Sequence, residues 1–229
     1  MAQIDFAEVL LFTDRDPSSL GLDTASQIRV IPIAKIESSE AYSRFMLESL
    51  ADHITTSHCL IVQWDGHVID AQRWQSEFLD YDYIGASWPQ FDDGHDVGNG
   101  GFSLRSRRLL EACQTTGFQR HHPEDVAICR TNRGLLEDQG MKFAPLALAD
   151  QFSAERSGDA GVSFGYHGVF LMPPLLGIDE FWKVYEDLSD RGTVWTDFDS
   201  LLASAVRGSS GLSRGLRLML DRLRCFMSR

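Results

Sequence analysis

The sequence has no excess of basic residues, no closely paired cysteines and no long apolar run. Its 229 residues carry 21 Lys and Arg against 33 Asp and Glu, a formal net charge of −12. This balance disfavours nonspecific binding of nucleic acid, which depends on clustered positive charge. No apolar run approaches the roughly 18 residues that span a bilayer. The first residues also lack the basic start and the small-residue cleavage site of a signal peptide.

The four cysteines, at positions 59, 113, 129 and 225, form no CxxC pair and stand among apolar residues. This pattern favours reduced, buried thiols over a disulfide framework, so we expect a cytoplasmic protein. Several catalytic signatures are missing as well. The chain has no Walker loop, HExxH or GxSxG motif, and GNGGF does not match the dinucleotide fingerprint.

Short apolar runs alternate with segments of helical periodicity. Strands are predicted at 6–13, 28–34, 58–64, 81–86 and 102–104. Helices are predicted at 38–54, 105–116, 123–140, 146–155 and 178–188. Such alternation is typical of an α/β sheet with helices on both faces. The length favours a single domain over residues 1–200, followed by a separate helical tail at 201–229.

The tail is basic and amphipathic. Residues 208–229 hold five arginines and one aspartate, a net charge of +4, which leaves −16 for the residues before them. Its leucines and its last methionine recur at helical spacing. Such a helix can lie on an anionic membrane surface, which would make the protein peripheral at the inner face of the membrane. The alternative, which we favour because one short helix anchors weakly, is that the leucines pack on the domain or on a partner.

Asp65 is a candidate metal ligand. It follows the strand predicted at 58–64, together with Gln63 and Trp64, and precedes a glycine. Ligands bind at the carboxyl ends of strands in open α/β sheets. Mg²⁺ and Mn²⁺ prefer carboxylate oxygen and share their coordination shell with ligand phosphates. The residues alone equally allow Asp65 to cap the turn.

Acids, a histidine and aromatics supply further candidates. Glu124 and Asp125 stand in the first turn of the helix predicted at 123–140, where the helix dipole favours negative charge. At the edge of a cleft, such an acid could also act as a general base. His167, in FGYHGVF, is either a structural histidine or part of a tight turn that faces a ligand. Trp88 is one of several aromatics between 64 and 88 that suit sugar rings or a core.

The glycines of VGNGGF, residues 97–102, need an explanation because each costs conformational entropy on folding. A backbone that approaches another group closely would provide one.

Taken in order, five segments resemble an uncharacterised bacterial family of glycosyltransferase-like domains of the GT-A group. They are VQWDGHV, FLDYDYIGASW, VGNGGFSLRSRRLL, PEDVAIC and FGYHG, and the resemblance covers about residues 6–170. It implies a GT-A-like fold, which is an open mixed sheet, mostly parallel, with helices on both faces. Compared with that group, the chain is expected to lack the first strand and helix, and its first residues to be a helix end.

The resemblance also implies roles for individual residues. Asp65 matches the metal-binding acid and His167 the late residue that joins the metal or diphosphate, so Mn²⁺ or Mg²⁺ is the expected cofactor. Asp125, with Glu124 as its substitute, matches the catalytic base. Arg105, at the predicted helix start, would assist the diphosphate or lie at the surface. The expected substrate-binding residues are Gln63, Trp88, Asn99, Gly100 and Gly101.

These implications predict a metal-assisted transfer of a sugar from a nucleotide-sugar donor to a hydroxyl of a glycan or polysaccharide. The alternative is a noncatalytic domain that binds nucleotide sugar or glycan. A phosphoester hydrolase ranks last, because Asp65 and His167 supply too few metal-directed groups for it. Nucleic acid is not an expected partner.

Overall fold

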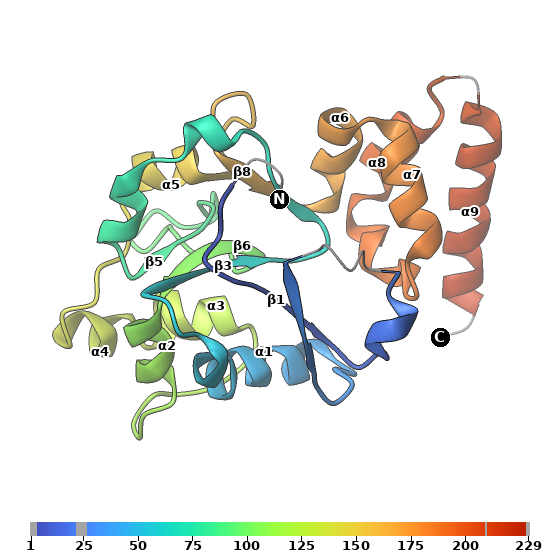
Figure 1. The fold of residues 1–229 in the computed structure, drawn as a ribbon. Helices are drawn as coiled ribbons and strands as arrows, with labels where there is room; N and C mark the ends of the chain where they lie inside the picture. The colour runs from blue at the N-terminus through green and yellow to red at the C-terminus, as the bar shows by residue number, and fades with distance from the viewer. Residues whose placement is uncertain (1–3, 22–26, 209, 228–229) are drawn as a thin grey trace.

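The computed structural model describes residues 4–21, 27–208 and 210–227. Its strands form three small sheets (Figure 1). One sheet is a parallel pair, β1 (Val9–Thr13) and β2 (Ile28–Pro32). The second has the antiparallel order β3-β6-β5, with β3 (His58–Val62), β5 (Tyr83–Ile84) and β6 (Phe102–Ser106). The third has the order β4-β8-β7, with β4 (Gly66–Val68), β7 (Ser153–Ala154) and β8 (Gly165–His167).

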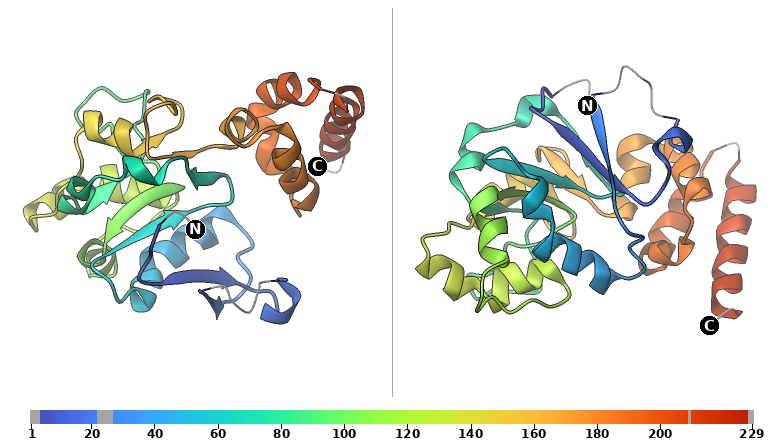
Figure 2. Two further views of the ribbon diagram at one scale, coloured as in Figure 1. Left: turned by 45° about the horizontal axis from the view of Figure 1, so that its top comes forward. Right: turned by 60° about the horizontal axis from the view of Figure 1, so that its bottom comes forward.

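The helices lie around these sheets and continue beyond them. The described helices are α1 (Ser39–Glu48), α2 (Arg107–Cys113), α3 (Glu124–Val126), α4 (Arg133–Asp138), α5 (Leu146–Phe152), α6 (Met172–Leu176), α7 (Ile178–Asp187), α8 (Phe198–Ala205) and α9 (Gly211–Met227). None of them combines the length and the apolar character needed to cross a membrane. Turning the molecule shows α6 to α9 as a bundle beside the sheets (Figure 2).

The predicted GT-A-like sheet, open and mostly parallel, is wrong. Among the described strands, three of the five pairings are antiparallel and no single sheet joins all strands. The physical reason is the connections. A parallel pair needs a crossover of a dozen or more residues, usually a helix. The segment from β5 to β6, residues 85–101, instead contains no helix. Its antiparallel bridge between Ser87 and Val97 returns the chain so that β6 runs antiparallel to both β5 and β3.

Local signals account for several helix ends. Ser38 caps α1, because its Oγ accepts a hydrogen bond from the backbone N–H of Ala41 at 3.1 Å. The helix predicted at 123–140 is divided into α3, a π-helical turn at 127–131, and α4. Residues 4–8, expected as a helix end, form no helix, and the strand that follows begins at Val9.

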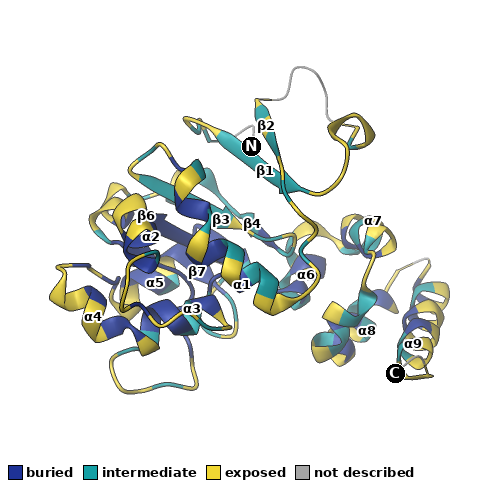
Figure 3. Ribbon diagram, turned by 90° about the horizontal axis from the view of Figure 1, so that it is seen from below, coloured by how far each residue is buried: buried dark blue, intermediate teal, exposed yellow. Residues whose placement is uncertain are grey.

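Burial differs between the sheets. Every residue of β6 is buried, whereas β1 is intermediate throughout (Figure 3). An aromatic cluster lies against β6 and β8, with ring centroids 5.2 to 6.2 Å apart, formed by Phe78, Phe102, Phe152 and Phe164. A second apolar core joins the end of β8 to the C-terminal bundle. Position 200 falls inside α8, and the tail helix predicted within 208–229 is α9.

Candidate functional site

Strand pairing brings the end of β3 against the glycine loop, residues 98–101. The register of β3 and β6 sets Val62 opposite Phe102. As a result, the backbone N–H of Gln63 donates to the carbonyl of Gly101 at 2.8 Å. The pairing of β4 with β8 sets Gly66 opposite His167. Residues about 100 positions apart in the chain therefore meet at one place.

Asp65, His167 and Glu155 form a connected row of charged side chains. His167 Nε2 lies 3.3 Å from Asp65 Oδ1, and His167 Nδ1 lies 3.3 Å from Glu155 Oε1. All three side chains are 12 to 15% exposed. Burial lowers the pKa of His167, but the contacts with Asp65 and Glu155 outweigh it and raise the pKa to about 10. The second contact is a hydrogen bond, whereas Asp65 Oδ1 and His167 Nε2 have no well-directed hydrogen-bond partner.

The glycine loop contacts this row. Asn99 has a positive φ of 32°, and its side-chain amide donates to Glu155 Oε2. Its Oδ1 accepts from the backbone N–H of Gly101 at 3.2 Å. A Cβ on Gly101 would lie 2.0 Å from His167 Nε2, which leaves glycine as the residue that fits. The close approach expected of this loop is thus an approach to the chain's own side chains.

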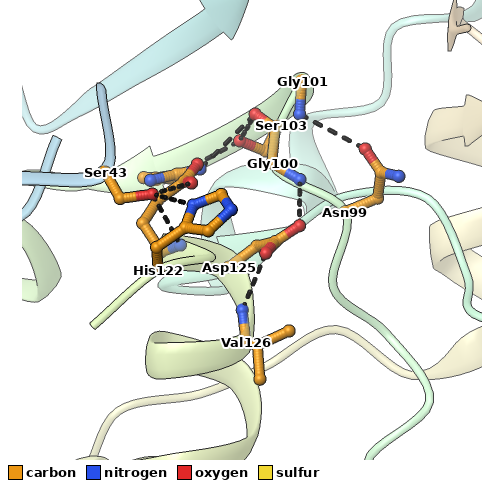
Figure 4. A network of polar contacts seen from close by, with 10 residues as sticks. Ser43, Asn99, Gly100, Gly101, Ser103, His122, Asp125 and Val126 are labelled. Carbon is orange, nitrogen blue, oxygen red and sulfur yellow. Dashed lines mark hydrogen bonds and ion pairs between the residues drawn. The ribbon is translucent and has the colours of Figure 1, made fainter. Parts of the chain in front are cut away.

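Asp125 contacts the same loop at Gly100 (Figure 4). Its Oδ2 accepts from the backbone N–H of Gly100 at 3.1 Å, and its Oδ1 accepts from that of Val126 at 2.8 Å. Burial and the neighbouring charge of Glu124 raise the pKa of Asp125 above its ordinary value. A carboxyl with a raised pKa that bonds this loop is a candidate proton acceptor.

Glu124 and Arg105 belong to the core instead. Arg105 lies in β6 and is fully buried, so neither the helix start nor the surface position expected of it is correct. Its Nη2 lies 3.2 Å from Glu124 Oε1. Glu124 also bonds Ser43, whose Oγ donates to Oε2 at 3.3 Å and accepts from the Glu124 N–H at 3.2 Å. The Ser43 hydroxyl lies 2.9 Å from His122 Nδ1 (Figure 4).

Trp88 is covered rather than open to a sugar. It is 7% exposed and packs in an apolar core beside Phe91. The loop lies directly on it, since a Cβ on Gly98 would fall 2.0 Å from the indole ring. Trp64, which neighbours Asp65, is 39% exposed and is the more accessible aromatic. A hollow of about 550 Å³ beside α2, lined by Asp82, Arg108 and Lys142 among others, has no residue in common with the site.

The family model of DUF5672, described as a protein of unknown function, matches residues 25–167. The chain belongs to this family. No curated protein and no solved structure matches it. The DUF5672 region ends at His167 and contains every candidate residue named above, whereas α6 to α9 lie beyond it.

The DUF5672 site has two atoms that suit a divalent cation. Asp65 Oδ1 and His167 Nε2 are buried, lie 3.3 Å apart and lack hydrogen-bond partners. Two ligands of one metal ion lie at about this separation, given metal–ligand bonds of roughly 2.1 Å. Glu155 forms a hydrogen bond with the other ring nitrogen of His167, and a metal-bound histidine usually has such a hydrogen-bond partner. The described residues contain no ready group of three His, Cys, Asp or Glu ligands, so ligand oxygens would have to complete the shell.

Sequence reasoning missed Glu155 and Ser43. Glu155 follows β7 in the polar stretch ERSGDAG and carries no motif. Ser43 lies within α1, where a helical serine gives no sign of a distant partner. One weak signal was present, because buried carboxylates need partners, and an acid near a predicted ligand histidine is a reasonable candidate.

Proposed function

We propose that this protein is a metal-assisted glycosyltransferase, which moves a sugar from a nucleotide-sugar donor to a hydroxyl group of a glycan. The observation that carries the proposal is the arrangement around two consecutive glycines. The backbone of Gly101 lies against the Asp65–His167 pair, and that of Gly100 bonds Asp125. The pair that would hold a cation and a carboxyl with a raised pKa therefore lie next to one loop. The order of the five segments that resemble glycosyltransferase-like domains is further support.

Asp65 and His167 would hold the cation, Mn²⁺ or Mg²⁺. When bound, this ion neutralises charge on the leaving diphosphate. The chain's own contribution is orientation. Glu155 bonds His167 Nδ1 at 3.3 Å and fixes the ring so that Nε2 faces Asp65. The Asn99 amide bonds Glu155 in turn and couples the row to the glycine loop.

Asp125 would accept the proton of the attacking hydroxyl. The N–H groups of Gly100 and Val126 fix the direction of its carboxylate. Its raised pKa makes it a stronger base than an ordinary aspartate, which brings the acceptor hydroxyl closer to deprotonation at neutral pH. Glu124 is not assigned this role, because Arg105 and Ser43 bond its carboxylate in the core.

One observation favours a second candidate, a noncatalytic domain that binds nucleotide sugar. Both carboxylate oxygens of Asp125 accept backbone hydrogen bonds, and both ends of the Asn99 amide are bonded within the chain. A side chain that is already satisfied in this way can serve the loop alone. Such a domain would bind the donor without turning it over.

The test measures release of nucleoside diphosphate from a panel of sugar nucleotides with Mn²⁺ and an added glycan acceptor. Asp65→Asn and Asp125→Asn should each abolish release, whereas Asp138→Asn, an exposed aspartate on α4, should not. Thermal unfolding with uridine or guanosine diphosphate and Mn²⁺ gives a second readout. Stabilisation without release supports the binding domain. Release that survives in both site variants contradicts the roles given to Asp65 and Asp125, and the absence of both release and stabilisation contradicts both candidates.

A further inference from the structure

Helix α9 packs on the molecule through a narrow face. Gly211, Gly215, Leu218 and Asp221 are its buried residues. At Gly215 a Cβ would lie 2.7 Å from a side-chain carbon of Val206, so the helix approaches the end of α8 closely. Figure 1 shows α9 at the outer edge of the bundle.

The opposite face of α9 is apolar and uncovered. With 100° of rotation per residue, the exposed apolar side chains of α9 occupy one arc of about 120° on the helix surface. No charged or polar residue lies within this arc. Exposure ranges from 42% at Leu220 to 91% at Leu212. We call this surface the outer face, and it consists of Leu212, Leu216, Met219, Leu220, Leu223 and Phe226. Of the leucines of α9, Leu218 is buried against the bundle, whereas the described part of the chain leaves those of the outer face uncovered.

Positive charge borders the outer face. Asp221 is shared by three guanidinium groups, those of Arg191 at 2.9 Å, Arg217 at 3.0 Å and Arg224 at 3.6 Å. One carboxylate against three cations leaves a net charge of +2, which Glu186 of α7, beside Arg217 and Leu216, reduces to +1. The Arg217 and Arg224 side chains remain 51% and 69% exposed. On the helix surface both lie next to Leu220, at one border of the apolar arc. Residues 1–207 carry −16, so positive charge is concentrated in the tail.

This combination of charge and apolar surface selects among possible occupants. A second copy of the chain would bring the same arginines to the contact, and like charges would oppose pairing. An anionic bilayer offers hydrocarbon to the apolar arc and phosphate groups to the arginines. The strongly acidic remainder would be repelled from that surface, which orients the molecule with α9 toward it.

We propose that the outer face of α9 docks on an anionic lipid bilayer, with the helix axis parallel to the membrane plane. The apolar side chains enter the boundary between headgroups and acyl chains, and Arg217 and Arg224 bind lipid phosphates. Contact through one helix makes the attachment reversible. The inference stands on α9 alone and is independent of the proposed sugar transfer.

The experiment is flotation of the full chain with vesicles of phosphatidylcholine, with and without phosphatidylglycerol. We expect binding only to the vesicles with phosphatidylglycerol, and weaker binding at high salt. Leu216→Glu with Leu223→Glu should weaken binding at least about tenfold, because it charges the apolar arc. The matched control is Leu135→Glu with Leu146→Glu, which changes two exposed leucines on α4 and α5 and should bind as the wild type does.

Arg217→Gln with Arg224→Gln leaves the apolar arc intact and should reduce the preference for phosphatidylglycerol. Thermal unfolding of each variant shows that the fold is kept. Failure of the wild type to float with anionic vesicles overturns the proposal. Equal binding by Leu216→Glu with Leu223→Glu overturns it as well. A third outcome also overturns it. If the wild type binds no vesicles but is a dimer in light scattering, and the double leucine variant is a monomer, then a second copy of the chain covers the outer face.

Discussion

We expect substitutions of the neighbouring acids Glu124 and Asp125 to differ in their effect on the free energy of unfolding, because Glu124 is the counter-charge of a buried arginine. Arg105 is 0% exposed, and of the described carboxylates only that of Glu124 lies within 4.0 Å of it. Glu124→Ala removes this counter-charge and leaves the guanidinium buried beside Tyr83. Removing one partner of a buried ion pair costs about 3–5 kcal/mol. We expect Glu124→Ala to lose about that much free energy of unfolding, a large share of the roughly 5–15 kcal/mol of a typical domain.

The assay is urea unfolding followed by circular dichroism, with the free energy of unfolding extrapolated to water. The double variant Glu124→Leu with Arg105→Met removes both charges and should recover most of the loss, because apolar side chains of similar volume replace the pair. Asp125→Asn is the neighbouring control. It removes a charge that burial disfavours but leaves one of two backbone N–H donors without its acceptor, so it should cost about 1 kcal/mol, well below the loss in Glu124→Ala.

A loss below about 1 kcal/mol in Glu124→Ala would refute the reasoning. It would mean that water or another group compensates the Arg105 guanidinium. Glu124 would then again be a candidate base equal to its neighbour. A double variant less stable than the single one would also contradict the account, because it would show that Arg105 stabilises the fold through its other contacts, such as that with Ser103 at 3.0 Å.

Other predictions concern glycine packing, pH dependence and thiol reactivity. Gly101→Ala should cost about 1–3 kcal/mol in urea unfolding because its Cβ overlaps an imidazole ring. Gly134→Ala, in open space on α4, should stabilise by about 0.5–1 kcal/mol. Because the folded pKa of Asp125 lies above its ordinary 3.8, its contribution to stability is fully present below that pH and is lost as pH rises through the raised pKa. The wild type should therefore lose stability relative to Asp125→Asn over that range of pH, and parallel pH curves would contradict this. Burial raises the pKa of the Cys113 thiol to about 12 and that of Cys129 further, so mass spectrometry should find neither alkylated until the protein unfolds.

Sequence patterns located the elements better than their pairing. The strand predicted at 58–64 is β3 at 58–62, and the helix predicted from position 38 begins there, with Ser38 as the N-cap of α1. Both are local properties, set by hydrophobic runs and by capping side chains. Pairing depends on the connections, and the residues of 85–101 do not reveal that this segment returns antiparallel without a helix. The predicted parallel sheet failed for this reason.

Arg105 shows how a shift of two residues changes a role. The run RSRRLLEA favoured a helix from position 105, with the arginine at its exposed start. In the structure β6 continues to Ser106, and the Ser106 hydroxyl accepts from the N–H of Leu109 at 3.1 Å to begin α2. The arginine therefore belongs to a buried strand and needs an acid in the core. Helix boundaries carry this uncertainty because one capping serine can move them.

The glycine loop was correctly predicted to allow a close approach, but sequence alone could not identify the approaching group. Packing within the chain explains three glycines, because a Cβ would overlap Trp88 at position 98, the Glu124 and Arg105 side chains at position 100, and His167 at position 101. Their presence thus gives no independent argument for a bound sugar. The functional case has to rest on groups that internal packing leaves unsatisfied.

Several buried polar side-chain atoms of the described residues lack a hydrogen-bond partner, so the arrangement of these atoms matters more than their number. Other buried side-chain atoms without hydrogen-bond partners belong to Tyr83, Arg105, Ser153, Tyr166 and Trp195. Asp65 Oδ1 and His167 Nε2 differ because they face each other at 3.3 Å, with side chains still about 15% exposed. Because the contacts with Asp65 and Glu155 raise the pKa of His167 to about 10, a cation held between the two atoms would replace the Nε2 proton. Replacing either side chain should therefore abolish stabilisation by Mn²⁺ in thermal unfolding.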